Sequence, residues 1–374
     1  MKKTISAAIV VALSVFWAGA QQTGFLPGHL AALRAGDGEL DLHLKQSPIF
    51  IDQFDEDGGN QTPSFTVAIP TNGPDTLFFN GHAATEGNLS RSADHKLLGF
   101  AGYTGVNLLQ MKGAPSLLDI KRAFCTVDPA GAIHTTVYKG LGAVEKMNPR
   151  GVVTDGSNNF WGCGNAFGTV YYNPGSSSGA VEFKAMPSSH NIKIVDRMIC
   201  ATLNGADSTA SDSLPGIYSF SDRHGNDVAF PREEDAAPKL QVGSAAPYTK
   251  IAGFDMSPGG TTAYIADTTA GIQKYVKAGG VWKFAYNFSI PQNIPAAQNH
   301  EAGCFGLVVD FSGHAPVIYA TTTEGYGGCV NSNRVVRIVD TNAMATVITL
   351  AQAPSARIAY RGIDFTPENS PARH

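Results

Sequence analysis

The sequence predicts an all-β protein, a six-bladed β-propeller, on three observations. The composition is that of a turn-rich β protein: 41 of 374 residues are glycine, and only 16% are charged where about 25% is usual. A glycine-led motif recurs along the chain, and the two ends of the chain each supply part of one repeat. Hydrophobic residues make up 43% of the sequence, enough for a large core.

The recurring motif is a glycine, a short apolar strand, an Asp or Ser turn and a second strand. Gly306-Leu307-Val308-Val309-Asp310 followed by Val317–Ala320 is a clear copy. The leading glycines of five copies lie at positions 87, 151, 253, 306 and 362. The interval between 151 and 253 is about twice the intervals after it, so we expect a degenerate copy midway, with strands at 192–195 and 198–201. Six copies predict six blades; seven is the alternative if 103–140 holds more than the outer half of a blade.

Each full copy is expected to hold four strands. In the copy near residue 250 they are placed at 250–256, 261–267, 271–277 and 281–289, because Pro258-Gly259-Gly260 and Ala278-Gly279-Gly280 have hairpin-turn chemistry. The last copy has only its first strand, and strands at 30–33, 48–53 and 64–69 supply the others. This pairing closes the ring and removes an open sheet edge. Residues 103–121, 203–213 and 222–249 read as long loops.

The N-terminus has the pattern of an export signal. Lys2 and Lys3 precede the apolar run Ile5–Gly19, and Ala18-Gly19-Ala20 is a small-x-small cleavage pattern. We therefore expect a signal peptide at 1–20, a single propeller domain at 21–374 and a frayed tail at 368–374. No later apolar run approaches the ~18 residues of a membrane span. The expected location is secreted or periplasmic.

The formal net charge is −4, so no basic excess exists to neutralise phosphates, which argues against nucleic-acid binding. The five cysteines are Cys125, Cys163, Cys200, Cys304 and Cys329. In an exported chain they can oxidise, but the odd number leaves at least one unpaired within the chain. Cys304 and Cys329 lie inside one repeat and are the first candidates for a disulfide. Two separately buried thiols are the alternative.

Several segments resemble a family of exported, glycine-rich microbial β-propeller proteins that is uncharacterised. The resemblance is carried by Leu33–Gly38, Ser47–Asp52 and Thr85–Asp94, and it continues through Arg150–Asp155, Ala266–Tyr275 and Tyr360–Pro367. It covers most of the mature chain. It implies the propeller fold and export, and it assigns no catalytic residue. The five cysteines depart from this family, which is usually poor in them.

Three charged residues stand directly before repeated glycines: Glu86, Arg150 and Arg361. Equivalent positions in a propeller face one end of the central channel, so we expect these residues to converge. Two arginines would suit a carboxylate or sulfate, and Glu86 could act as a base or a metal ligand, with His82 as another possible base. The alternative is an Arg–Glu ion pair that locks adjacent blades.

Two acidic patterns have simpler interpretations. The repeated acids Asp155, Asp255, Asp310 and Asp364 are expected to cap strand turns. The segment Asp52–Asn60 resembles a calcium loop but lacks the EF-hand spacing, so a surface hairpin turn is the alternative. Calcium is therefore a possible cofactor, and no other cofactor is evident.

The sequence contains no catalytic triad, zinc motif or phosphate-binding loop that fits its context. The leading hypothesis is an exported module that binds a carbohydrate, an envelope component or a protein on one face. The rival is a propeller enzyme, a polysaccharide lyase, glycosidase or lactonase, with its site at the mouth of the channel. An enzyme should gather charged groups with shifted pKa values, whereas a structural ring should pair them off.

Overall fold

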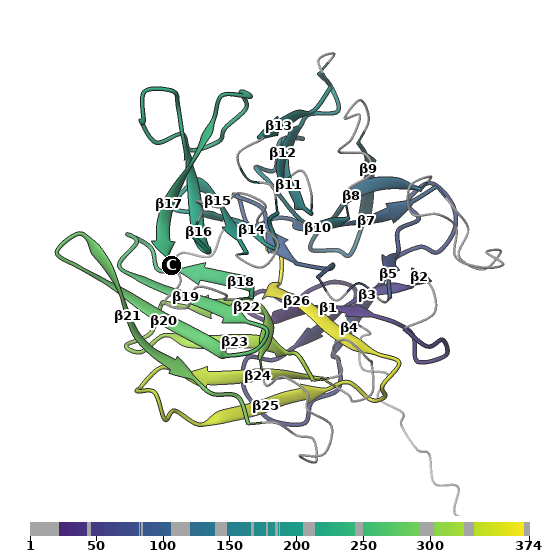
Figure 1. Cartoon of the computed structure of the whole chain (residues 1–374). Helices are drawn as coiled ribbons and strands as arrows, with labels where there is room; N and C mark the ends of the chain where they lie inside the picture. The colour runs from purple at the N-terminus through teal and green to yellow at the C-terminus, as the bar shows by residue number, and fades with distance from the viewer. Residues whose placement is uncertain are drawn as a thin grey trace, which may run out of the picture.

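The computed structural model describes residues 22–42, 46–81, 83, 85–105, 120–138, 148–165, 168–176, 179–183, 186, 188–204, 214–243, 250–291, 303–324 and 333–369. Within these ranges the regular secondary structure is entirely β-strand. Six four-stranded sheets form a ring, the arrangement of a six-bladed β-propeller (Figure 1). Among the described residues there is no helix of the length and hydrophobicity needed to cross a membrane.

Each blade is an antiparallel meander whose innermost strand lies nearest the ring axis. The closing blade consists of β26 (Ala359–Phe365), β1 (Leu30–Ala35), β3 (Ile49–Phe54) and β4 (Phe65–Ala68). The next blade consists of β6 (Ser90–Arg91), β7 (Leu98–Thr104), β8 (Lys121–Val127) and β9 (Ile133–Val137). The third consists of β10 (Pro149–Thr154), β11 (Phe160–Gly164), β12 (Thr169–Tyr172) and β13 (Val181–Phe183).

The other three blades follow in chain order. The fourth consists of β14 (Ile192–Val195), β15 (Met198–Leu203), β16 (Gly216–Ser221) and β17 (Ala237–Gly243). The fifth consists of β18 (Ile251–Met256), β19 (Thr262–Asp267), β20 (Gly271–Ala278) and β21 (Val281–Phe288). The sixth consists of β22 (Cys304–Asp310), β23 (Val317–Thr322), β24 (Arg334–Val339) and β25 (Val347–Gln352). A small extra sheet pairs β2 (Gln46–Ser47) with β5 (Phe79–Asn80).

The ring closes between the two ends of the chain, as predicted. Strand β26 pairs antiparallel with β1, from Leu30 opposite Phe365 to Ala35 opposite Ala359. Figure 1 shows the yellow β26 beside the purple β1. The expected degenerate copy is also present, because β14 and β15 lie where its strands were predicted.

The repeated glycines let neighbouring inner strands approach closely. A Cβ added at Gly362 would lie 2.2 Å from the Leu89 nitrogen of the next blade. A Cβ at Gly306 would lie 2.5 Å from the Arg361 carbonyl oxygen, and one at Gly253 would lie 2.5 Å from the Phe305 carbonyl oxygen. Each contact is shorter than any carbon–oxygen or carbon–nitrogen van der Waals separation, so only glycine fits. The motif therefore begins with glycine because of how blades pack.

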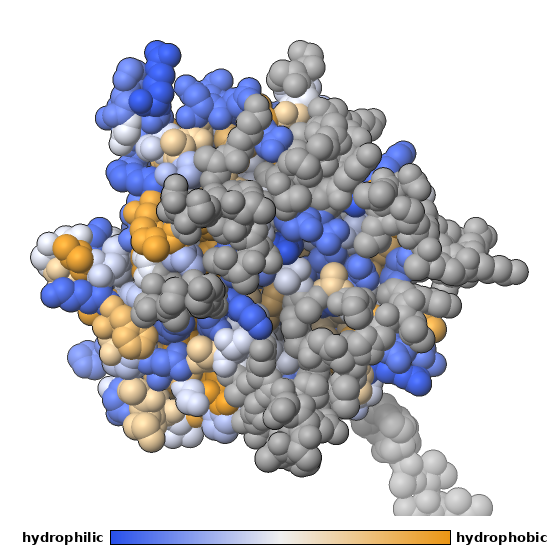
Figure 2. All heavy atoms as spheres, in the orientation of Figure 1, coloured by the Kyte–Doolittle hydropathy of each residue, from blue (hydrophilic) through white to orange (hydrophobic). Residues whose placement is uncertain are grey.

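The blades are joined by apolar side chains from facing sheets. Between the fifth and sixth blades, Tyr264 and Ile272 pack in one cluster with Leu307, Val309 and Ile318. Burying each such large side chain contributes about 1.5–3 kcal/mol. The exposed apolar side chains in Figure 2 form small separate groups on this face. The exposed large residues include Val281 and Phe284 on β21, Ile348 on β25 and Met344 in the turn before β25.

Two expectations about irregular segments are wrong. The interval 222–249 contains the strand β17, the fourth strand of its blade. Glu368, assigned to a frayed tail, is 4% exposed, and its N–H donates to the His95 carbonyl at 2.9 Å. Residues 1–20, the expected signal peptide, and 370–374 lie outside the described residues, as does most of the expected loops at 103–121 and 203–213.

Candidate functional site

The channel has two mouths, which we define by the ends of the inner strands. The upstream mouth lies where these strands begin, at Glu86, Arg150 and Arg361. The downstream mouth lies where they end, at Lys193, Asp255 and Asp364. Arg361 and Asp364 both belong to β26, whereas the other four residues come from different inner strands or, for Glu86, from the segment before β6. The two mouths therefore present different chemistry at opposite ends of one ring.

At the upstream mouth, Glu86 is 0% exposed, and each oxygen of its carboxylate accepts a hydrogen bond from a described residue. One carboxylate oxygen, Oε1, accepts from the Tyr103 hydroxyl at 2.6 Å, and Oε2 accepts from the Asn80 N–H at 3.0 Å. Arg361 donates to the backbone carbonyls of Glu86 and Gly81, both at 3.2 Å. The guanidinium thus links the closing blade to the next through carbonyl oxygens rather than through the Glu86 carboxylate.

The electrostatic balance at Glu86 favours the neutral acid. Burial raises the pKa of Glu86 to about 7, although the Tyr103 hydrogen bond and the positive charges of Arg361 and Arg150 oppose this rise. Arg150 donates to the Ser188 hydroxyl at 3.0 Å. The structure therefore brings Glu86, Arg150 and Arg361 within electrostatic range of one another. His82 lies outside the described residues, so its role stays a prediction.

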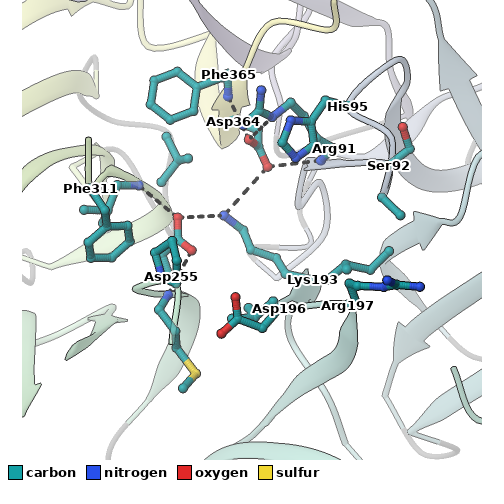
Figure 3. Close-up of a pocket in the computed structure, with 17 residues that line it drawn as sticks. Arg91, Ser92, His95, Lys193, Asp196, Arg197, Asp255, Phe311, Asp364 and Phe365 are labelled. Atoms are coloured by element: carbon teal, nitrogen blue, oxygen red, sulfur yellow. Dashed lines mark hydrogen bonds and ion pairs between the residues drawn. The ribbon is translucent and has the colours of Figure 1, made fainter. Parts of the chain in front are cut away.

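The downstream mouth is hollowed into a pocket of about 340 Å³ with Lys193 at its centre (Figure 3). The Lys193 ammonium lies 3.6 Å from Asp255 Oδ2 and 3.7 Å from Asp364 Oδ2. It also donates to the Leu307 carbonyl oxygen at 2.8 Å. These four residues come from β14, β18, β26 and β22. One side chain of the fourth blade thus reaches groups from three other blades.

Both carboxylates also bond to the inner strand of the following blade. Asp255 Oδ2 accepts from the Val309 N–H at 2.9 Å, and Asp364 Oδ2 accepts from the Arg91 N–H at 3.1 Å. The Arg91 Nε lies 3.3 Å from Asp364 Oδ1, and its guanidinium lies over the Phe365 ring at 5.2 Å. The pocket is therefore built on a charged network that holds five inner strands together, β6, β14, β18, β22 and β26.

The prediction that all four repeated acids cap turns is correct for two of them. Asp155 and Asp310 each accept from the N–H two residues later at 2.8 Å. Asp255 and Asp364 instead lie within β18 and β26 and face the pocket. Burial and the nearby Asp364 charge raise the pKa of Asp255, whereas Lys193 opposes this rise.

The sequence distinguishes Asp255 and Asp364 from the two turn-capping acids by their distance from the repeated glycine. They follow the repeated glycine by two residues, whereas Asp155 and Asp310 follow it by four. An acid two residues earlier falls inside the strand rather than at its end. Lys193 had no such signal, because it lies in the degenerate copy and no glycine marks its register.

The rim of the pocket carries a tight hairpin turn with an unusual backbone. Asp196 and Arg197 join β14 to β15, and both have positive φ, 48° and 65°. This matches a two-residue turn that usually requires Asn or Gly. Asp196 Oδ2 accepts from the Gly259 N–H of the next blade at 2.7 Å, which holds the turn in place. Arg197 is exposed at the rim.

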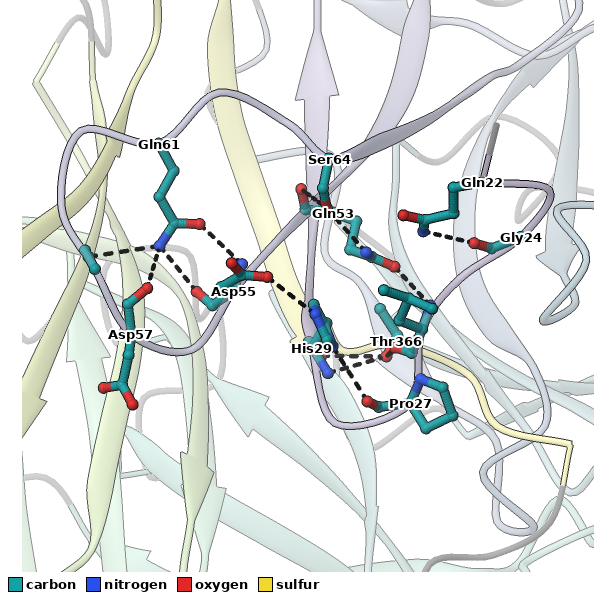
Figure 4. A network of polar contacts seen from close by, with 12 residues as sticks. Gln22, Gly24, Pro27, His29, Gln53, Asp55, Asp57, Gln61, Ser64 and Thr366 are labelled. Atoms are coloured by element: carbon teal, nitrogen blue, oxygen red, sulfur yellow. Dashed lines mark hydrogen bonds and ion pairs between the residues drawn. The ribbon is translucent and has the colours of Figure 1, made fainter. Parts of the chain in front are cut away.

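The proposed calcium segment, Asp52–Asn60, is organised by protein groups (Figure 4). Asp52 is buried in β3 and pairs with Arg34 Nε at 2.6 Å. The Gln61 side chain closes the following loop by accepting from the Asp55 N–H at 2.8 Å and donating to the Asp57 carbonyl at 2.7 Å. Across the described ranges, no group of three or more His, Cys, Asp or Glu side chains is arranged to hold a metal ion. Calcium binding stays a prediction.

Four of the cysteines are buried thiols: Cys125, Cys163, Cys200 and Cys304. Burial raises the pKa of each thiol, to about 12 for Cys163 and Cys200. Such thiols are poor nucleophiles. Cys329 lies outside the described residues, so its pairing with Cys304 stays a prediction.

No family model and no curated protein matches this sequence. Among solved structures, a chain of a nidogen–laminin complex is similar with a TM-score of 0.52 and 10% identity, covering 90% of this chain and 98% of that one. A putative 6-phosphogluconolactonase from Bacteroides uniformis gives a TM-score of 0.44 and 13% identity, covering 87% of this chain and 83% of that one. At 10% identity, the similarity to the chain of the nidogen–laminin complex supports the propeller fold and no particular function.

Proposed function

We propose that this protein is an exported β-propeller that binds a carbohydrate, an envelope component or another protein at its downstream mouth and leaves the ligand chemically unchanged. The observation that carries this proposal is the downstream pocket, in which Lys193 and two aspartates from other blades form one network. A pocket at the axis of a ring is concave and pre-formed, as ligand sites usually are.

The way in which the pocket charges are held favours recognition over catalysis. Lys193, Asp255 and Asp364 each have an oppositely charged neighbour and a backbone partner. These contacts fix the three charged groups in place. Fixed donors and acceptors supply specificity for a polar ligand.

Export is part of the proposal and rests on the N-terminal segment. Lys2, Lys3 and the apolar run before Ala18-Gly19-Ala20 have the order of a signal peptide. The resemblance to exported propeller proteins agrees with this. A secreted or periplasmic binding protein would meet polysaccharides, envelope components and other exported proteins.

The second candidate function is an enzyme that works at the upstream mouth, and one observation favours it. Burial raises the pKa of Glu86 to about 7, which suits a general acid or base near neutral pH. Arg150 and Arg361 lie close enough to lower that pKa and could attract an anionic substrate. A polysaccharide lyase, glycosidase or lactonase would use such a group.

The test is to incubate the mature protein with insoluble polysaccharides and envelope preparations, with and without calcium, and to measure both retention and product size. The proposal expects retention on at least one material and chains of unchanged length. Asp310→Asn, outside the pocket, serves as the matched control for Asp255→Asn. Shortened chains, or retention that Asp255→Asn leaves intact, would contradict the proposal.

A further inference from the structure

We propose that the downstream pocket holds a neutral, hydroxyl-rich ligand, a sugar unit whose hydroxyl groups bridge Lys193 and its two flanking aspartates. This inference rests on the proposed function and names its ligand class. Three features of the pocket support it: the balance of its charges, the unused hydrogen-bond donors of Lys193 and the apolar wall beside them.

The charges that line the pocket balance. With His95 neutral, three lining side chains are cations and three are anions: Arg91, Lys193 and Arg197, and Asp196, Asp255 and Asp364. An anionic ligand would approach three carboxylates, and a cationic ligand would approach three cations. Like charges brought together in a partly desolvated site are costly. The balance therefore favours a ligand without net charge.

Within the part of the chain that the structure describes, the Lys193 ammonium donates one hydrogen bond, to the Leu307 carbonyl, and so keeps capacity for a ligand. An ammonium carries three N–H donors, and here one of them reaches the Leu307 carbonyl at 2.8 Å. The carboxylates of Asp255 and Asp364 attract the charge but lie at 3.6 and 3.7 Å, beyond direct hydrogen-bond distance. The side chain is 6% exposed, so an oxygen from a ligand that enters the pocket can occupy this space.

A hydroxyl group matches this arrangement better than other polar groups do. It accepts and donates at once, so one hydroxyl can accept from Lys193 and donate to Asp255 or Asp364. A carboxylate only accepts and would be repelled by the aspartates. An ammonium only donates and would be repelled by Lys193. Lys193 lies between two carboxylates. Two adjacent hydroxyls of one sugar can therefore each accept from Lys193, while one donates to Asp255 and the other to Asp364.

The wall beside the charged network is apolar and suits the C–H face of a sugar ring. Phe311, Met256, Val308 and Pro258 line this side of the pocket. The Phe311 ring is supported from behind by Tyr264, with ring centroids 6.0 Å apart. The volume of about 340 Å³ is at the lower end of the range for ligand pockets, roughly 300–1,000 Å³. The pocket therefore fits one small unit, such as the end of a chain.

The inference is tested by calorimetric titration of the mature protein with four classes of probe. Methyl glycosides and disaccharides of glucose, galactose and mannose are the neutral probes. Galacturonate, glucosamine and diglycine are the anionic, cationic and zwitterionic ones. We expect binding of at least one neutral sugar, weakened tenfold or more by Asp255→Asn. Asp310→Asn, at an aspartate of the sixth blade that does not line the pocket, should change the affinity less than twofold.

Phe311→Leu is a second variant, which keeps every charge in place and should weaken the same sugar threefold or more. Melting temperatures of all variants separate lost binding from lost folding. If a charged or zwitterionic probe binds and depends on Asp255, the sugar assignment fails while binding at the downstream mouth stands. If no probe binds and retention on polysaccharide does not depend on Asp255, both the assignment and the proposed function fail.

Discussion

Glu86 and Lys193 are both buried, but their surroundings compensate their charges to different degrees. Lys193 lies between two carboxylates and donates to a carbonyl oxygen. Glu86 accepts from Tyr103 and Asn80, while the nearby Arg361 donates to backbone carbonyls. Burial consequently raises the pKa of Glu86 to about 7. The upstream mouth therefore contains a carboxyl group that titrates near neutral pH.

Glu86→Gln should change how stability depends on pH. Because the folded-state pKa of about 7 lies above the ordinary 4.5, Glu86 contributes stability that is fully present below pH 4.5 and is lost as the pH rises through 7. The loss is about 3 kcal/mol. The neutral amide should match the wild type near pH 5 and exceed its free energy of unfolding near pH 8. Urea denaturation at both pH values measures this, and parallel stability curves for the two proteins would refute it.

The sequence predicted that charged residues of the repeats lie at the channel, but it did not separate their positions. Glu86, Arg150 and Arg361 were expected to converge because they precede repeated glycines. Arg361 donates to the Glu86 carbonyl oxygen, and the charges of both arginines lower the pKa of the Glu86 carboxyl group. Asp255 and Asp364 were placed with the turn-capping Asp155 and Asp310. Their roles differ because a two-residue shift along the repeat moves the acid from the turn into the channel-facing strand.

The innermost strands of neighbouring blades pack backbone against backbone at three of the repeated glycines, Gly253, Gly306 and Gly362. The N–H of Gly362 donates to the Gly87 carbonyl at 2.7 Å, and that of Asn88 donates to the Arg150 carbonyl at 2.9 Å. These bonds run between blades rather than within them. A side chain at Gly362 would collide with the backbone of the next blade. This close approach explains why the repeat begins with glycine.

Gly362→Ala should destabilise the protein by about 3 kcal/mol or more, because the added methyl group meets backbone atoms that cannot move independently. The nearest are the Leu89 nitrogen at 2.2 Å and the Gly87 carbonyl oxygen at 2.6 Å. Gly313→Ala is the control, since that exposed glycine has its nearest atom at 3.5 Å. It should shift stability by about 0.5 kcal/mol or less. Equal melting temperatures for the two variants would show that the close approach does not limit packing.

Strand positions were predictable where hairpin turns contain glycine. The four strands of the fifth blade lie within one residue of their expected bounds, because Gly259-Gly260 and Gly279-Gly280 fix the turns. Strand β17 was missed because it is an outer strand with mostly exposed side chains. It also follows the charged run Arg232–Asp235 and contains Pro238, a residue that is depleted in strands, so its short apolar–polar alternation was not read as a strand.

The whole ring depends on one pairing between the two ends of the chain. Strand β26 is the innermost strand of the closing blade, and β1 is its only partner within that sheet. The same strand carries Arg361 toward the upstream mouth and Asp364 toward the downstream pocket. Closure and both candidate sites therefore depend on residues 359–365.

A chain that ends at residue 358 should fail to form the ring, because β1 and the inner strands on both sides lose their neighbour. We expect it to aggregate or to unfold without a cooperative transition, since an unpaired strand edge is exposed. A chain that ends at residue 369 keeps every described strand and should melt like the full chain. Size-exclusion chromatography and thermal melts compare them. A monomeric, cooperatively folded chain ending at 358 would show that closure is dispensable.

The architecture of the molecule was predictable because repeat spacing and the split blade are both linear features of the sequence. The downstream pocket was not, because its charged residues Arg91, Lys193, Asp255 and Asp364 come from four blades. Only the radial geometry of the ring brings positions 91 and 364 together. A site assembled in this way has no motif of fixed spacing.

The most direct test of the account compares wild type, Asp255→Asn and Glu86→Gln for retention on the polysaccharide that binds best and for the length of that polysaccharide afterwards. The account predicts that Asp255→Asn loses retention, that Glu86→Gln keeps it, and that all three proteins leave the chains intact. Shortening of the chains by wild type that Glu86→Gln abolishes would contradict it. That result would make the upstream mouth an active site.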